Sequence, residues 1–478
     1  MQDAYRIACL DAAQLVDLYR ARELSPVEVL DAALQVVDDH EPVLNALWVR
    51  SDASATVEAL ASENRWHRGE PTGPIDGVPV TIKENLARVG IPMPLGCAGV
   101  TPQVPTRSSP VAERISEAGG VVLGSTVMPD WGMLSSGVSS LHGVTRSPWN
   151  PDWTTGGSSS GAGAACAAGY APLHVGTDIG GSIRLPGTWL GLATLKPSAG
   201  RVPLDNPYLG RVAGPITRTI ADTATLMSVI ARPDARDWTA PAVEDRVPWT
   251  DQMTTHPHGL RVGLHLDAGF GMPVDPEVAT LVARAGELFD SAGAQVETLE
   301  PFLRPGMIED LDTFWRVRSW NDFVALDQDG RDRVLPFIRR WIHPAAQISG
   351  ARVLGCYQTI LELQRATVSA TLPYDVVVSP VAPVAAFPAD WPMPFGGLDG
   401  PDLGMAHIGF TAPYNMSGQP AATVNCGFTR DGRTVGIQIA GRRFDDIGVL
   451  RAAAWYEAAR PADAAPHWPI APHRRLAP

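Results

Sequence analysis

One stretch of the chain, residues 154–186, constrains the fold more than any other. It reads TTGGSSSGAGAACAAGYAPLHVGTDIGGSIRLP, so two glycine-serine clusters, 156–161 and 180–182, enclose a run of small apolar residues. Consecutive glycines give the backbone dihedral angles that side chains forbid, and they let other atoms come close to the main chain. The clusters could therefore aim a row of N–H groups at one point beside hydroxyl groups. That arrangement suits either the binding of an anion or nucleophilic attack on a carbonyl.

Three other interpretations of this stretch compete. Glycine-serine clusters are often flexible loops, but these two border the apolar segments 162–168 and 172–175, which are typical of buried elements. A nucleotide-binding loop would need G-x-x-x-x-G-K-[ST], whereas the stretch contains no lysine. Residues 157–161 match the esterase pattern G-x-S-x-G, with Ser159 central, but residues 150–154 make a poor strand before it, so we interpret this match as chance.

The base that a serine nucleophile needs is predicted in GVPVTIKEN, residues 77–85. Apolar residues alternate at 78, 80 and 82, which predicts a strand with Thr81 and Lys83 on its opposite face. Most lysines are solvated surface charges, and that is the alternative interpretation of Lys83. In a dry pocket, however, burial disfavours the ammonium form and lowers the pKa, so that the lysine can act as a general base.

Taken together, Lys83, Ser158 and Ser182 resemble the Ser-cisSer-Lys triad of the amidase signature family of serine hydrolases. The matching segments are GVPVTIKEN, TGGSSSGAGAACAAG and GTDIGGSIRLP, and they occur in the family's order. The signature serines are normally 24 positions apart, and 182 − 158 = 24, which selects Ser158 rather than Ser159 or Ser160. The chain departs from the family pattern at Ser160, where glycine is usual, and at Glu84, where aspartate is commoner.

The resemblance implies a role for each matching residue. Ser182 would be the nucleophile, Ser158 a proton-relaying serine on a cis peptide, and Lys83 the base. The oxyanion hole would consist of the backbone N–H groups of Ile179, Gly180, Gly181 and Ser182. The expected substrate-binding residues are Trp131, Met133, Leu134, Gly157 and Thr177, although packing explains the first three equally well.

Other polar residues near these motifs are expected to have structural roles. Asp178 and Arg184 would hold the loop by polar contacts, and His142 would be structural because a histidine base is superfluous beside Lys83 and Ser158. We expect no cofactor and no metal, because the eleven histidines form no H-E-x-x-H motif and the chemistry needs no metal.

Alternation of strands and helices predicts an α/β fold, a mixed central sheet covered on both faces by helices. The expected divisions are a helical wrapping segment (1–70), a signature core (71–230), a surface connection (231–258), a substrate-shaping subregion (259–402), and the rest of the core with a loose tail (403–478). Helices are expected over 8–22, from a capping box at Ser25, over 52–67 and over 276–292. Residues 260–299 should form a βαβ unit, and Asp431-Gly432 a hairpin turn.

The leading functional hypothesis is an amidohydrolase that cleaves a carboxamide through a serine acyl-enzyme and releases ammonia or an amine. Aromatic residues between 300 and 400 hint at an apolar or aryl small-molecule amide. Two alternatives are the glutaminase subunit of a tRNA-dependent amidotransferase and a catalytically silent binding protein. The resemblance also implies a homodimer.

Composition narrows the partners and the compartment. The net charge of −13 disfavours nucleic acid, and the chain lacks an apolar run long enough for a membrane span. Five scattered cysteines without metal-ligand spacing, and an N-terminus without a signal-peptide pattern, favour the cytoplasm.

Overall fold

A mixed sheet of 11 strands organises the computed structural model, which describes residues 2–242, 247–251, 253, 256–397, 399 and 404–470. The strands in spatial order are β1 (Leu47–Arg50), β3 (Val121–Thr126), β2 (Pro79–Lys83), β6 (Leu173–Asp178), β8 (Val212–Thr217), β7 (Ala193–Lys196), β12 (Ala421–Phe428), β13 (Thr434–Gly441), β11 (Val376–Pro380), β9 (Arg261–Leu264) and β10 (Gln295–Thr298). A separate two-stranded sheet pairs β4 (Val138–Ser139) with β5 (Gly143–Val144).

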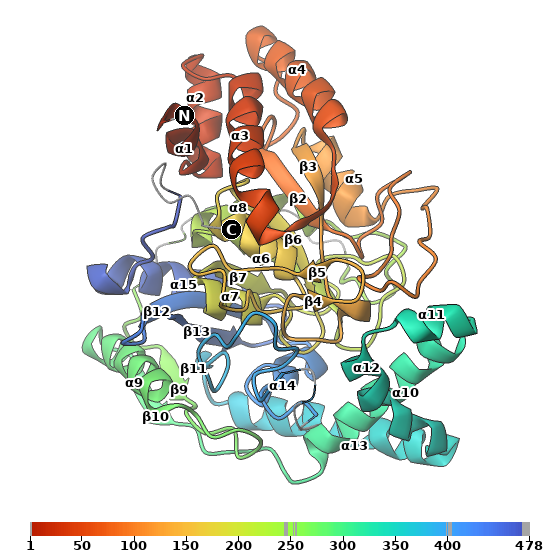
Figure 1. The fold of residues 1–478 in the computed structure, drawn as a ribbon. Helices are drawn as coiled ribbons and strands as arrows, with labels where there is room; N and C mark the ends of the chain where they lie inside the picture. Colours follow the sequence, from red (N-terminus) through yellow and green to blue (C-terminus); the bar gives the residue numbers. More distant parts are fainter. Residues whose placement is uncertain are drawn as a thin grey trace.

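Helices cover both faces of this sheet, as the sequence predicts (Figure 1). Their bounds are α1 (Gln2–Ala8), α2 (Ala12–Ala21), α3 (Pro26–Leu44), α4 (Asp52–Arg68), α5 (Pro110–Glu117), α6 (Ser160–Ala167), α7 (Arg184–Leu190), α8 (Ile220–Ile230), α9 (Pro276–Ser291), α10 (Met307–Val324), α11 (Gln328–Arg333), α12 (Pro336–Ile342), α13 (Gly350–Thr371), α14 (Ala412–Met416) and α15 (Asp446–Ala459). Short 3₁₀ turns span Asp130–Gly132, His343–Gln347 and Ala462–Ala464. None of these helices is both long and apolar enough to cross a membrane, within the residues that the structure describes.

The strands that matter for the site are parallel. β2 pairs in parallel with β3 on one side and with β6 on the other, whereas β6 pairs antiparallel with β8. The carboxyl ends of neighbouring parallel strands meet at one edge of a sheet, where α/β proteins bind ligands. Lys83 ends β2 and Asp178 ends β6, so the topology brings both residues to that edge.

The predicted helix over 8–22 is wrong, because the chain forms two helices there. α1 ends at Ala8, and α2 begins at Ala12 after a capping box in which the Asp11 side chain accepts a hydrogen bond from the Gln14 N–H. The capping box at Ser25 is confirmed, with Pro26 as the first residue of α3. Local cap chemistry therefore decided the boundary that amphipathic spacing missed.

The later elements agree with the sequence. β9, α9 and β10 form the predicted βαβ unit, with β9 and β10 parallel and Asp275 capping α9. Asp431-Gly432 lies in the turn between the antiparallel strands β12 and β13. The last eight residues of the predicted tail lie outside the described residues.

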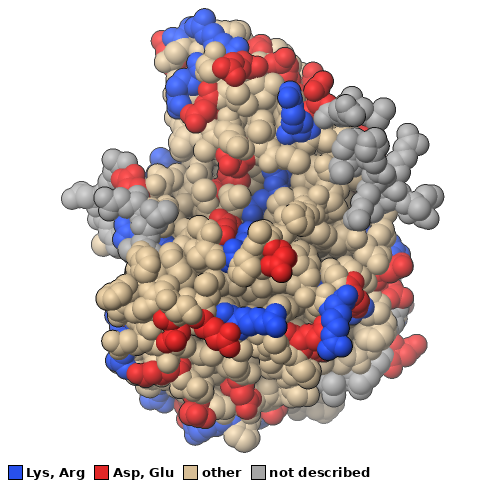
Figure 2. Space-filling view, turned by 90° about the vertical axis from the view of Figure 1, so that its left-hand side faces the viewer, with Lys and Arg blue, Asp and Glu red and all other residues tan. Residues whose placement is uncertain are grey.

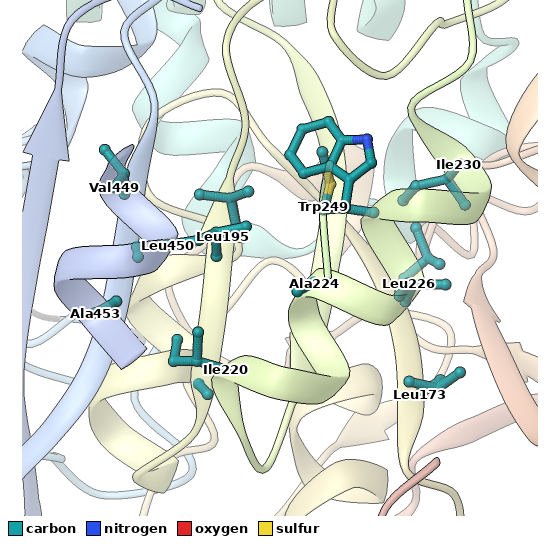
Figure 3. Packing of buried hydrophobic residues seen from close by; sticks show 14 of the residues in the cluster. Leu173, Leu195, Ile220, Ala224, Leu226, Ile230, Trp249, Val449, Leu450 and Ala453 are labelled. Atoms are coloured by element: carbon teal, nitrogen blue, oxygen red, sulfur yellow. The ribbon is translucent and has the colours of Figure 1, made fainter. Parts of the chain in front are cut away.

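The largest core lies between the sheet and helices α5, α8, α9 and α15 (Figure 3). Leu173 and Leu195 from the sheet pack there with Ile220 and Leu226 of α8 and Leu450 of α15. Small residues of α6 pack on the opposite face with Ile216 of β8. This second layer brings the start of α6 close to the ends of β2 and β6.

Helices α10 to α13 form a separate group beside the sheet (Figure 1). Their buried residues belong to a second apolar cluster that also contains Met133, Leu134 and Leu185 from the signature region. On the face drawn in Figure 2, acidic and basic side chains are interspersed rather than gathered into one large patch of either sign. The group therefore adjoins the segments that sequence analysis singled out.

Candidate active site

Lys83 is fully buried at the carboxyl end of β2. Its Nζ donates hydrogen bonds to Ser158 Oγ at 2.8 Å and to Ser159 Oγ at 3.1 Å. Burial lowers the pKa of the lysine to about 7, and the charge of Arg211 acts in the same direction, against Asp178 and Glu84. A substantial fraction of Lys83 is therefore neutral near pH 7, which is the form a general base needs.

The first serine cluster is the loop that leads into α6. The Gly157–Ser158 peptide is cis, in agreement with the resemblance, and Ser159 precedes the first residue of α6. The Ser159 hydroxyl also donates to the Thr177 carbonyl at 3.2 Å and accepts from the Thr177 N–H at 3.3 Å. Ser159 therefore ties this loop to β6, while the Ser158 hydroxyl is bound to Lys83.

The second cluster is the loop between β6 and α7, which contains Ser182. The Ser182 carbonyl accepts a hydrogen bond from the Ser159 N–H at 3.3 Å, so the two serine loops touch. The Asp178 carboxylate accepts from the N–H groups of Gly181 at 2.7 Å and Ile183 at 3.0 Å, and it pairs with the buried Arg184. Burial alone would raise the pKa of Asp178, but Arg184 and these hydrogen bonds hold it below its ordinary value.

These contacts divide the four predicted oxyanion donors into two groups. The Gly181 N–H is already bonded to Asp178, whereas the N–H groups of Ile179, Gly180 and Ser182 donate to no protein atom among the described residues. Gly181 has a φ of +137°, a conformation that glycine tolerates and other residues rarely adopt. Asp178 thus fixes the turn that leaves the three other N–H groups available.

A cavity adjoins Ser182 and joins the serine loop to helix α10. Its lining residues are Gly132, Met133, Leu134, Ser135, Ile179, Gly180, Ser182, Leu185, Trp315, Arg318, Met405 and Ile408. Larger surface hollows occur elsewhere, but Ser182 lines only this cavity among those in the described part of the chain. Most of the wall is apolar, and Arg318 is its one charged residue.

Comparisons with known proteins agree with this geometry. The family model described as Amidase matches residues 28–450. The chain belongs to the amidase signature family. An acylamidase from Rhodococcus erythropolis is 34% identical over 461 residues, which cover 95% of this chain and 96% of that protein. A bacterial aryl acylamidase of known structure superposes with a TM-score of 0.88 at 28% identity, covering 97% of this chain and 99% of the other.

A glutamyl-tRNA(Gln) amidotransferase component from Synechococcus, the one designated by the letter A, is also similar. It is 31% identical to this chain over 91% of this chain and 94% of its own length. The family assignment and the similarity to the acylamidase make this chain an amidase, an enzyme that hydrolyses amide C–N bonds.

The structure brings only part of the predicted substrate-binding set of this amidase to the cavity. Met133 and Leu134 line it, whereas Trp131 lies beside it, partly buried in the apolar cluster. Gly157 faces the backbone of Leu134 and Ser136, where a side chain would clash at 2.4 Å. Thr177 lines a neighbouring hollow, and its hydroxyl accepts a hydrogen bond from Asn85 at 3.0 Å.

The two departures from the family pattern have partners of their own. Glu84 contacts the Nε2 of His142 at 3.0 Å and accepts from the Met128 N–H at 3.1 Å. His142 therefore contacts an acid behind the lysine rather than a serine, which supports its predicted structural role. Ser160 donates weakly to the Val127 carbonyl at 3.4 Å.

Several residues of the site were not found from the sequence. The second hydrogen bond of Lys83, to Ser159, lies in a motif that offered three adjacent serines without distinguishing their contacts. Asn85 follows Lys83 by two positions and could have been considered with it. Arg318 and Ile408 lie in segments without a recognisable motif, so only the fold places them beside Ser182.

Proposed function

We propose that this amidase cleaves its substrate through an acyl-enzyme on Ser182, with Ser158 and Lys83 moving the proton. One observation carries the proposal: a fully buried lysine with a pKa near 7 contacts the Ser158 hydroxyl at 2.8 Å, in a loop bonded to that of Ser182. A serine hydroxyl is a weak nucleophile until a neighbouring base takes its proton.

In the first half-reaction, Ser182 Oγ attacks the amide carbonyl carbon. Its proton passes to Ser158, whose own proton passes to neutral Lys83. The N–H groups of Ile179, Gly180 and Ser182 stabilise the negative oxygen of the tetrahedral intermediate, and each such donor is worth about 100-fold to 1000-fold in rate. The proton then returns through Ser158 to the leaving nitrogen, and ammonia or an amine departs.

In the second half-reaction, water attacks the acyl-enzyme and gives its proton to Lys83 through Ser158. The carboxylic acid leaves, and Ser182 recovers its proton. The bonds formed and broken balance without any cofactor, so the proposed mechanism needs only the chain and water.

We propose an apolar or aryl amide as the substrate class. The apolar wall of the cavity, with Met133, Trp315 and Ile408, supports this choice. Similarity to an acylamidase and to an aryl acylamidase supports it as well.

The test is product release from aliphatic amides, anilides, amino-acid amides and glutamine, by the wild type and by Ser182→Ala. Release of an amine or ammonia by the wild type alone is the expected result. Hydrolysis of glutamine alone would instead favour a role in an amidotransferase, which the similar Synechococcus protein represents.

Two further proposals concern the setting of the enzyme. The five cysteines are free thiols and four are buried, which supports a reducing compartment, the cytoplasm. The homodimer implied by the family resemblance is a proposal that light scattering of the purified protein tests.

A further inference from the structure

Two arginines flank one tyrosine at the wall of the catalytic cavity. Arg318, on helix α10, lines the cavity that contains Ser182, and its guanidinium carbon lies 5.5 Å from the centre of the Tyr208 ring. The guanidinium carbon of Arg211 lies 5.3 Å from the same ring centre. Arg211 lines the neighbouring hollow with Asn85 and Thr177, and its charge acts on Lys83. Both cations therefore lie close to the reacting groups.

Neither cation has an acidic partner within the chain as described. No carboxylate oxygen of the described residues lies within 4.0 Å of the guanidinium of Arg211 or Arg318. The acid that acts on both from a greater distance is Asp322 of the same helix. One distant carboxylate and two guanidinium groups leave an excess of positive charge at this wall.

The hydrogen-bonding capacity of Arg318 is also largely unused. Its Nη2 lies against the sulfur of Met133, a weak acceptor, and its Nε is buried without a hydrogen-bond partner. A buried donor without a partner costs about 1–3 kcal/mol, and such groups are usually satisfied by water, an ion or a ligand. A planar guanidinium fits a carboxylate, because two parallel N–H groups meet its two oxygens.

We propose that Arg318, supported by Arg211, binds a carboxylate on the amide substrate, so that the enzyme prefers amides that carry a carboxylate a short distance from the scissile bond. This inference rests on the proposed function and narrows its substrate class. The remaining wall is apolar, which suits the hydrocarbon or aryl part between the amide and the carboxylate. The carboxylate can belong to the acyl part or to the amine part, and the test separates these two sources.

The test compares pairs of substrates that differ only in charge. On the acyl side, glutaric acid mono-4-nitroanilide is paired with 5-methylhexanoic acid 4-nitroanilide, in which an isopropyl group replaces the carboxylate. On the amine side, 4-(butanoylamino)benzoate is paired with N-(4-isopropylphenyl)butanamide. The wild type should show a higher kcat/KM for the anion of at least one pair, and raised salt should reduce that preference.

The variant Arg318→Met should reduce the anion-to-neutral ratio of kcat/KM by about 10-fold to 100-fold, the range expected for charged hydrogen bonds. Arg318→Lys keeps the charge without the planar fork and should fall between the two. The matched control is Arg365→Met, because Arg365 is exposed on α13 and lines none of the described cavities near Ser182. It removes one positive charge from the α10–α13 group and should leave the ratio as in the wild type.

Two results would overturn the proposal: no preference for either anion in the wild type, or a preference that Arg318→Met leaves intact. In the second case Arg318 only stacks on Tyr208. If the wild type hydrolyses none of the four compounds, the proposed function fails, and calorimetric titration with glutarate then decides the inference separately. Binding that weakens by about 10-fold to 100-fold in Arg318→Met would support it, and equal affinity of both proteins would overturn it.

Discussion

Two buried lysines in this amidase share a lowered pKa, but their contacts differ. Burial is the main cause for both and places the pKa of Lys83 and of Lys196 at about 7. Lys83 contacts the hydroxyls of Ser158 and Ser159, whereas Lys196 donates to the Pro197 carbonyl at 2.8 Å. A lowered pKa alone does not identify a catalytic base, because the neighbouring atoms decide what the neutral amine can do.

The pH dependence of turnover should report Lys83. Because the neutral lysine is the base, log kcat/KM should rise with a slope of one below pH 7 and level off above about pH 7. Lys83→Ala should lower kcat/KM by about 100-fold to 10,000-fold and remove this limb. Lys196→Met is the matched control, and its profile should keep the limb. A limb that survives in Lys83→Ala, or vanishes only in Lys196→Met, would contradict the assignment.

The same lysine should make stability depend on pH. The pKa of Lys83 falls from 10.5 to about 7 on folding, so between these values the unfolded chain binds more protons than the folded chain. The free energy of unfolding should therefore rise with pH in this window, and more steeply for the wild type than for Lys83→Met. Urea denaturation at pH 7.5 and pH 9.5 measures the two slopes, and equal slopes would contradict the lowered pKa.

At the residue scale, the sequence predicted identities better than contacts. The spacing of 24 positions selected Ser158, which Lys83 does contact. It could not show that the Gly181 N–H is bonded to Asp178, because that hydrogen bond depends on the three-dimensional turn. Arg318 lies 136 positions beyond Ser182 (318 − 182 = 136), and no local pattern links the two.

At the scale of elements, the loop between β6 and α7 depends on one buried ion pair. Asp178 pairs with Arg184, which also donates to the Thr411 carbonyl and to Gln438. Asp178→Asn would leave the Arg184 charge buried without its counter-ion, at a cost of about 3–5 kcal/mol in the free energy of unfolding. It should also lower kcat, because the loop carries the oxyanion N–H groups.

Urea denaturation measures the loss of stability, and substrate turnover measures the loss of rate. The control is Asp17→Asn, which removes half of the exposed pair that Asp17 makes with Arg20 on α2. Exposed pairs contribute little, so this variant should behave as the wild type. Equal behaviour of the two variants would show that the buried pair does not organise the loop.

The start of helix α6 is held by a close backbone contact. A Cβ added at Gly161 would lie 2.2 Å from the Ala46 carbonyl oxygen and 2.6 Å from the Val127 nitrogen. Gly161→Ala should therefore destabilise the fold by about 1–3 kcal/mol or more and misplace the preceding serines. Gly350→Ala is the control, because nothing lies within 4 Å of its added Cβ at the start of α13. Thermal denaturation compares them, and equal midpoints would contradict the contact.

Elements with strong local signals were predictable, and their arrangement was not. The capping box of α3 and the βαβ unit from β9 to β10 follow from cap residues and periodicity. The break between α1 and α2 was missed, because apolar spacing continues across it and only the Asp11 cap marks it. The antiparallel pairing of β6 with β8 has no local signature either, since cross-strand partners come from distant segments.

At the scale of the whole molecule, the two ends of the described chain pack against the layer that carries the site. Ile470 is buried with Val36 of α3 and with Ala164 and Tyr170 from the α6 region. Ile470→Ala should cost about 2–4 kcal/mol in the free energy of unfolding. Leu372→Ala, at a position 60% exposed, is the control and should change little. Urea denaturation of both variants decides, and an unaffected Ile470→Ala would contradict this role of the chain ends.

The measurement that tests the central claim most directly is the site of covalent modification. The amidase is treated with a fluorophosphonate, digested and mapped by mass spectrometry, with Ser182→Ala and Lys83→Ala treated in parallel. We predict an adduct on Ser182 in the wild type, none in Ser182→Ala, and slow labelling in Lys83→Ala. An adduct on Ser158 or Ser159 in the wild type, or full amide turnover by Ser182→Ala, would contradict the account.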